Sequence, residues 1–191
     1  MKPINRLGVR LALLAAPAVF ACTGVAAAEA TLPPMHPGFW QNSMVMNMQM
    51  QGDNSPPDMT PTISYSCENA YGLAEQIKMT SGMLSGCTFD LEGGGSTFTI
   101  TTDCVNPDGQ KGSLKGTSTL TLLGTTAIHL TGTTSGNIAN MQMNNTSVSD
   151  GKWVGDCPAG WVSGDFGKMV NGVLQKDGNF NNMPKMPSAG N

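Results

Sequence analysis

The chain has 191 residues, of which 39% are hydrophobic and only 12% are charged, and its formal charge at pH 7 is −3. An average soluble domain is about a quarter charged, so uncharged polar groups must cover most of this surface. The weak negative charge excludes a strongly basic nucleic-acid-binding protein and a polyanionic disordered chain, and the length fits one domain with extensions.

The first 30 residues have the pattern of a secretory signal peptide. An apolar run over residues 11–21 is too short to cross a bilayer, and Ala28-Glu29-Ala30 has the small-x-small form of a cleavage site. We expect cleavage after Ala30, which leaves 161 of the 191 residues, or after Ala28. No later stretch is apolar for long enough to span a membrane. The basic residues that open the signal are Lys2, Arg6 and Arg10.

Attachment to a membrane through a lipid anchor is the alternative prediction for this segment. The segment Val19-Phe20-Ala21-Cys22 resembles a bacterial lipobox, in which the cysteine is acylated and becomes the first residue of the mature chain. Phe20 departs from that pattern, because a small residue is usual there. We therefore expect a periplasmic or secreted protein after cleavage, with anchoring through Cys22 as the alternative.

Removal of the signal peptide makes the remaining chain more acidic and takes away every arginine. It removes three of the 10 basic residues and one of the 13 acidic residues, so the formal charge becomes −5. Without arginine, the bidentate contacts that recognise phosphate and guanine are missing. We therefore expect no nucleic-acid partner.

From Pro37 onward, apolar residues recur at every second position, which predicts β-strands. A long strand carries Trp40 and four methionines on one face, and a second strand spans 62–67. Residues 69–80 break this period. Apolar residues there stand at i, i+3, i+4 and i+7, which predicts one amphipathic helix; they are Ala70, Leu73, Ala74 and Ile77.

The two-residue period then returns, and it predicts further strands. Residues 87–91 and 98–104 form a hairpin pattern around Gly93-Gly94-Gly95. The later strands are expected at 117–123, 126–133, 137–149 and 152–157, separated by turns at Gly124, Ser135-Gly136 and Asp150-Gly151. Because short turns favour pairing of neighbours, we predict a mainly β fold: an antiparallel meander of about seven or eight strands, strongly curved or an open barrel, with one inserted amphipathic helix.

The predicted domain organisation has three parts: a signal peptide over 1–30, a disulfide-stapled β-domain over 31–157, and an extension over 158–191. Within the extension, apolar residues predict a short amphipathic helix, and residues from Asp177 onward predict a disordered tail. The apolar residues of that helix are Phe166, Met169, Val170, Val173 and Leu174.

Four cysteines remain after the signal peptide, at Cys67, Cys87, Cys104 and Cys157. An even number in an exported chain predicts two disulfides. A zinc site or a redox dithiol is the rival interpretation, but no C-x-x-C spacing occurs and neither histidine lies close to a cysteine. Of the three possible pairings we favour Cys67–Cys87 with Cys104–Cys157.

Three features follow one another along the chain: Met35-His36-Pro37-Gly38-Phe39-Trp40, then the methionine-rich strand with four spaced cysteines, and last Gly155-Asp156-Cys157. Their order resembles an exported bacterial family, the domain of unknown function 3617. The resemblance covers Met35 to Cys157, and Phe39 and Gln41 stand where the family usually has Leu and Glu. It implies an exported domain with paired cysteines, and it implies neither an activity nor a ligand.

The sequence offers little for catalysis. A nucleophilic triad needs a histidine base, and the two histidines are His36, beside prolines, and His129. His129 stands between Ile128 and Leu130, so on a strand it faces away from them and is expected at the solvent face or rim. No G-x-S-x-G, H-E-x-x-H or phosphate-loop pattern occurs. We therefore expect a non-enzymatic protein.

The methionines are the most distinctive feature. Met44, Met46, Met48 and Met50 recur at every second position, which places neighbours on one strand face about 6.7 Å apart. Two flexible thioethers at that spacing can converge on Cu(I) or Ag(I), so copper is a possible cofactor. Met141 and Met143 repeat the spacing, and Met35 with His36 could add a mixed site.

Three roles remain open for this methionine face: plastic filling of the core, lining of a site for an apolar ligand or partner, and metal binding. We predict an exported binding or envelope-maintenance module for an apolar ligand or an envelope protein partner. The alternative is a periplasmic Cu(I)- or Ag(I)-binding protein that uses the methionine-rich strand. Whether the face is packed or open separates the roles.

Overall fold

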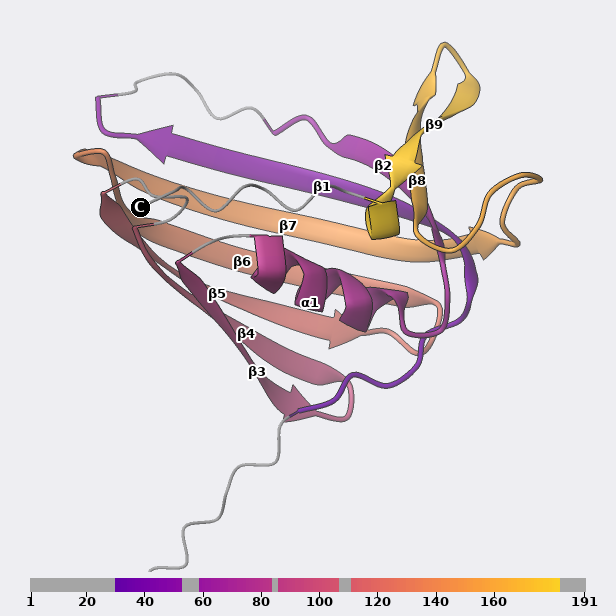
Figure 1. Cartoon of the computed structure of the whole chain (residues 1–191), viewed down its shortest axis with the longest axis horizontal. Helices are drawn as coiled ribbons and strands as arrows, with labels where there is room; N and C mark the ends of the chain where they lie inside the picture. The colour runs from indigo at the N-terminus through magenta and orange to yellow at the C-terminus, as the bar shows by residue number, and fades with distance from the viewer. Residues whose placement is uncertain (1–29, 53–58, 84–85, 107–110, 183–191) are drawn as a thin grey trace, which may run out of the picture.

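The computed structural model describes residues 30–52, 59–83, 86–106 and 111–182, which form one open antiparallel sheet of nine strands with one α-helix (Figure 1). The strand order across the sheet is β3-β4-β5-β6-β7-β1-β2-β8-β9. The helix is α1 (Gly72–Met83), and the strands are β1 (Gly38–Met50), β2 (Thr62–Glu68), β3 (Cys87–Gly94), β4 (Thr97–Val105), β5 (Gly112–Leu122), β6 (Ala127–Ile138), β7 (Met141–Gly155), β8 (Asp165–Val170) and β9 (Val173–Asn179).

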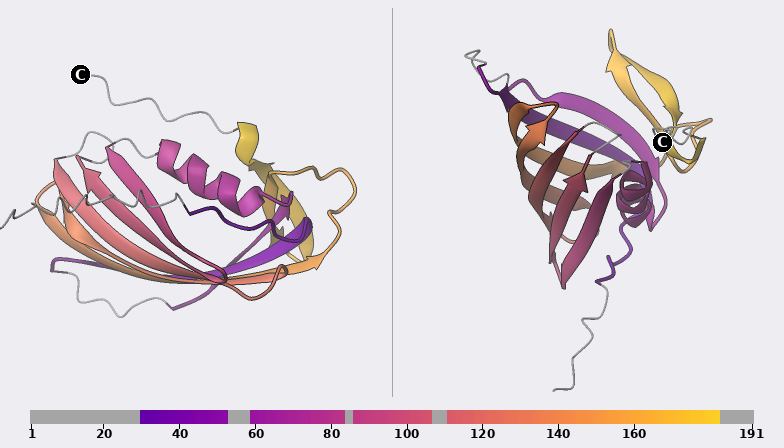
Figure 2. Two further views of the ribbon diagram at one scale, coloured as in Figure 1. Left: turned by 90° about the horizontal axis from the view of Figure 1, so that it is seen from below. Right: turned by 60° about the vertical axis from the view of Figure 1, so that its left-hand side comes forward.

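The sheet is strongly curved, and α1 lies across its concave face (Figure 2). Strands β3 to β7 follow one another as a meander, and β1 then pairs with both β7 and β2. The predicted mainly β fold, with a curved antiparallel sheet and one helix, is confirmed. The strand count is nine instead of seven or eight.

A compact core lies between α1 and one end of the concave face. Its buried members come from the segment before β1 and from strands β1, β4 and β5, and Leu73 of α1 packs against them. Leu32, just after the predicted cleavage site, packs there too, as does Ala30, the last residue before that site. The buried members are Met35, Trp40, Phe98, Leu120 and Leu122.

The helix predicted within residues 69–80 is confirmed. It begins at Gly72, and Asn69 caps its first turn. The Asn69 side-chain oxygen accepts a hydrogen bond from the Tyr71 N–H at 2.7 Å, and its amide donates to Glu75 at 3.0 Å. A Cβ at Gly72 would clash with the Glu68 carboxylate. The glycine therefore lets Glu68 pack against the start of the helix.

Two predicted turns are wrong. Strand β6 continues through Ser135-Gly136 and β7 continues through Asp150-Gly151, so three long strands replace the four expected over 117–157. The glycines mark crowded positions instead of turns. A Cβ at Gly136 would meet the Ser113 carbonyl, and a Cβ at Gly151 would meet Ile128 at 2.7 Å.

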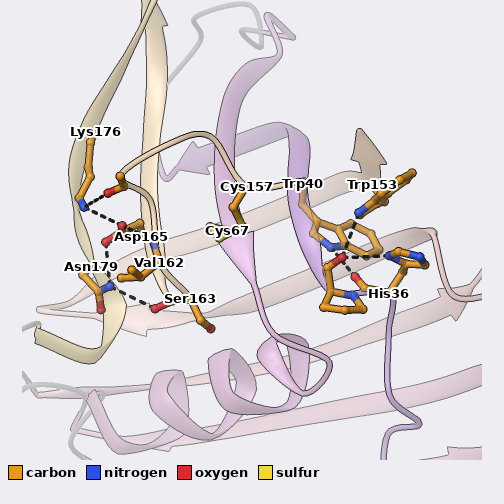
Figure 3. Close-up of a disulfide and its surroundings, with 12 residues drawn as sticks. His36, Trp40, Cys67, Trp153, Cys157, Val162, Ser163, Asp165, Lys176 and Asn179 are labelled. Carbon is orange, nitrogen blue, oxygen red and sulfur yellow. Dashed lines mark hydrogen bonds and ion pairs between the residues drawn. A yellow bond between two sulfur atoms is a disulfide. The ribbon is translucent and has the colours of Figure 1, made fainter. Parts of the chain in front are cut away.

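The predicted short helix after Cys157 is also wrong, because β8 and β9 form a hairpin there around Asn171-Gly172. Both turn residues have positive φ, 51° and 78°. Asp165 anchors the hairpin by accepting hydrogen bonds from Lys176 Nζ at 2.6 Å and the Val162 N–H at 2.7 Å (Figure 3). These partners, Lys176 foremost, lower the pKa of the Asp165 carboxyl to about 2. Strand β9 also extends past Asp177, where a disordered tail was predicted.

The two disulfides are Cys67–Cys157 and Cys87–Cys104, so the pairing favoured from the sequence is wrong. Cys87 and Cys104 stand directly opposite each other in the β3–β4 hairpin. Phe39 of β1 pairs with Cys67 of β2 on one side and with Gly155 of β7 on the other. Cys157 follows Gly155 by two residues and lies beside Cys67 (Figure 3). The cysteines pair where the sheet brings them together.

Residues 1–29 of the predicted signal peptide, which include the lipobox Cys22, lie outside the described residues, as do residues 183–191. Both N-terminal predictions therefore stay predictions. Within the described part of the chain, no helix is both long and apolar enough to cross a membrane.

The two disulfides are expected to contribute unequally to stability. Cys67–Cys157 spans 90 residues and Cys87–Cys104 spans 17, and the loop-closure model assigns about 4–5 kcal/mol and about 3 kcal/mol to loops of these sizes. We expect Cys67→Ala/Cys157→Ala to lower the unfolding free energy in urea more than Cys87→Ala/Cys104→Ala. A larger loss for the β3–β4 pair, or non-reducing peptide mapping that shows another pairing, would contradict this.

Candidate functional site

The Pro-Gly-aromatic motif and the Gly-Asp-Cys motif, far apart in sequence, meet at one end of the sheet. The Trp153 indole N–H donates to the Pro37 carbonyl at 3.1 Å, and the Trp40 indole donates to the His36 carbonyl at 3.0 Å (Figure 3). Gly38 has φ 134°, and a Cβ there would lie 2.5 Å from the Gly155 carbonyl. Glycine is therefore required for this close approach, and the motifs have a structural role. Asp156 is exposed beside them.

Met35 and His36 do not join the other methionines. The Met35 side chain is buried in the core next to Trp40, and its backbone N–H donates to the Ala70 carbonyl. The exposed His36 ring lies 4.5 Å from the Trp153 ring. The structure thus separates these two residues from the proposed methionine site.

Met44, Met46, Met48 and Met50, called the methionine row below, lie on the concave face. Met44 pairs with Ser149, which pairs with Leu130 beside the core, so all three share that face. The row is open, because its side chains are 40–45% exposed and none belongs to the core. The interpretation of these residues as plain core filling is therefore not supported.

The register between β1 and β7 brings two further methionines to the end of this row. Met50 stands directly opposite Met143. Met141, two residues before Met143 in β7, lies on the same face. Side chains in such cross-strand pairs are about 5 Å apart at Cβ. The two methionine groups that the sequence showed separately therefore form one surface of six thioethers.

Small and hydroxyl-bearing residues form the middle of the concave face. Gly132 stands between Ser118 and Ser147, and the next row contains Gly116, Thr134 and Asn145. Beyond them, apolar side chains from β3, β4 and β5 face the methionine row across the sheet; they are Phe89, Leu91, Ile100 and Leu114. Ile138 of β6 pairs directly with Met141 at the end of the face. The face therefore has two apolar sides and a low, polar floor.

Charge is distributed unequally between the two faces of strands β1–β7. Among their described residues, Glu68 is the one ionisable side chain on the concave face. Burial raises the pKa of its carboxyl, although a hydrogen bond with Ser66 opposes the shift. The convex face carries the acidic and basic side chains of the other strands: Asp90, Glu92, Asp103, Lys115, His129, Asp150 and Lys152.

Glu68 lines a small cavity of about 30 Å³ under α1, at the core end of the concave face. Trp40, Asn42 and Leu73 contribute to its wall, and Gln76 donates a hydrogen bond of 2.6 Å to the Glu68 carboxylate. A volume of this size suits one or two water molecules. It does not accommodate a large ligand.

His129 lies on the convex face, as its place between Ile128 and Leu130 predicted. Its Nδ1 lies 2.7 Å from the Asp150 carboxylate, and both side chains are exposed. The described residues contain no group of three His, Cys, Asp or Glu side chains that could hold a metal ion.

Sequence reasoning missed Asn145, whose Oδ1 is buried without a hydrogen-bond partner. Strand alternation could have placed it on the same face as Met143, but only the register shows that Met48 and Thr134 flank it. A buried acceptor without a partner is costly, so it marks a position where polar contacts are incomplete.

The chain belongs to the family described as "Protein of unknown function (DUF3617)", whose model matches residues 35–157. A search of curated proteins finds no match. Among solved structures, it is similar to Ail, the attachment invasion locus protein of Yersinia pestis, with 8% identity over 61% of this chain and 99% of that one and a TM-score of 0.24. The family match spans the domain from the opening motif to the last cysteine, and the two disulfides indicate an oxidising compartment.

Proposed function

We propose that this protein is an exported, non-enzymatic binding module whose concave face takes an elongated apolar ligand with the chemistry of an acyl chain. The observation that carries the proposal is the open methionine row, 40–45% exposed beside a packed core. Flexible thioethers adapt to chains of varied shape. Export to the periplasm, either free or anchored through Cys22, accords with the disulfides and would place the module beside envelope lipids.

The dimensions and charge of the face support a chain-like ligand. From Met44 to Met50 the strand rises about 20 Å, which is comparable to an extended long-chain fatty acid. Apart from Glu68 at the core end, the described strand residues offer this ligand no charged side chain. Exposed apolar side chains gathered on one face are characteristic of ligand sites.

Apolar binding can be measured with the uncharged dye 1-N-phenylnaphthylamine and its displacement by stearate. We expect Met46→Asn/Met48→Asn to weaken dye binding about tenfold or more, because two apolar contacts become polar. The matched control is Val148→Asn/Val154→Asn, which changes two exposed residues on the opposite face. An equal effect of both double variants, or no binding by the wild type, would refute the proposal.

Binding of Cu(I) or Ag(I) is a second candidate function, which the pairing of Met50 with Met143 favours. Three or four thioethers from two neighbouring strands can converge on one soft ion more readily than thioethers along a single strand. The residues concerned are Met48, Met50, Met141 and Met143.

Titration with Ag(I), followed by the methionine methyl signals in NMR, tests this second function. We expect Met50→Leu/Met143→Leu to weaken binding about tenfold, because two soft ligands are lost while side-chain volume is kept. Met59→Leu/Met169→Leu, which changes two exposed methionines outside this surface, should leave binding unchanged. Equal loss in both variants would show that scattered thioethers bind the ion.

A further inference from the structure

Asn145 gives the concave face a polar feature that a purely apolar ligand would not use. Its Oδ1 is buried and has no hydrogen-bond partner, in the middle of the face between Met48 and Thr134. A Cβ at Gly116 would lie 2.8 Å from the Thr134 hydroxyl. That hydroxyl therefore points toward β5, away from Asn145, and leaves the amide oxygen without a donor.

From this geometry we infer that the preferred ligand is an acyl chain that carries a hydroxyl group along its length, and that Asn145 is the residue that selects it. The inference rests on the apolar-binding function proposed above. A hydroxyl can both donate and accept, so it satisfies the Asn145 amide whichever end of the amide faces it. A plain hydrocarbon chain would leave the amide unpaired.

The Asn145 oxygen is buried, so a ligand hydroxyl reaches it only when a neighbouring side chain moves. Met48, directly across from Asn145, is 45% exposed and rotates about three side-chain bonds, so it can move aside for a ligand. Ser118 and Ser147 flank Gly132 in the next row and add hydroxyls to the same floor. The apolar sides would hold the hydrocarbon, and the floor would hold the hydroxyl.

A role in selecting the ligand can be distinguished from a structural role, because the Asn145 oxygen gains no hydrogen bond in the folded protein. When an amide with a buried, unpaired oxygen is replaced by an apolar side chain, the free energy of unfolding is expected to stay the same or to rise. Asn145→Val should therefore fold with at least wild-type stability in urea, and any loss of selectivity in this variant comes from the ligand contact.

The test compares stearate with a series of monohydroxylated stearates as competitors for the dye. We expect at least one isomer to bind the wild type about fivefold more tightly than stearate, as one neutral hydrogen bond to a group otherwise unpaired predicts. Asn145→Val should abolish this preference while stearate affinity stays the same or rises. Thr146→Val, one residue away on the convex face, should retain it.

The outcomes distinguish this inference from the function on which it rests. If the wild type binds stearate but no isomer more tightly, or if Asn145→Val keeps the preference, Asn145 does not select the ligand and the acyl-chain function still stands. If the wild type binds none of the fatty acids, the acyl-chain function fails and this inference fails with it.

Discussion

The pairing of β1 with β7 determines how the two ends of the concave face differ. One continuous register runs from Trp40 opposite Trp153 to Met50 opposite Met143. Because side chains alternate along a strand, this register puts the buried tryptophan and the open methionines on the same face. A slip by one residue would turn the methionines to the convex side and Trp40 out of the core. Gly38 and the Cys67–Cys157 disulfide hold the register at the core end.

The side chains that line the remaining concave face explain why it stays unfilled. The core is small and lies under α1, and the face beyond it has glycine and serine at its centre and longer apolar side chains at its margins. A Cβ at Gly132 would lie 2.4 Å from the Ser118 hydroxyl, so this serine would have to rotate away to admit a larger residue. The small residues of the floor therefore leave the apolar side chains along β1 exposed.

Local periodicity was enough to predict much of this molecule. The alternation of apolar residues gave β1, β2, the β3–β4 hairpin and the placement of the methionines on one face, and the i, i+3, i+4 pattern gave α1. The turn predicted at Ser135-Gly136 is wrong because glycine is common both in turns and at crowded positions within strands. The disulfide pairing, the meeting of Met50 with Met143 and the unpaired Asn145 oxygen depend on register between distant strands, which single-strand patterns do not contain.

The central claim is that the methionine row forms an open surface that an apolar ligand covers. Peroxide oxidation read out by mass spectrometry tests it most directly, because thioether oxidation follows exposure. The account predicts that all four methionines of the row oxidise much faster than Met35, which is 6% exposed. Stearate should then protect the row while Met59 and Met169 stay reactive. Protection of the row equal to that of Met35 without any ligand would show a closed core and contradict the account.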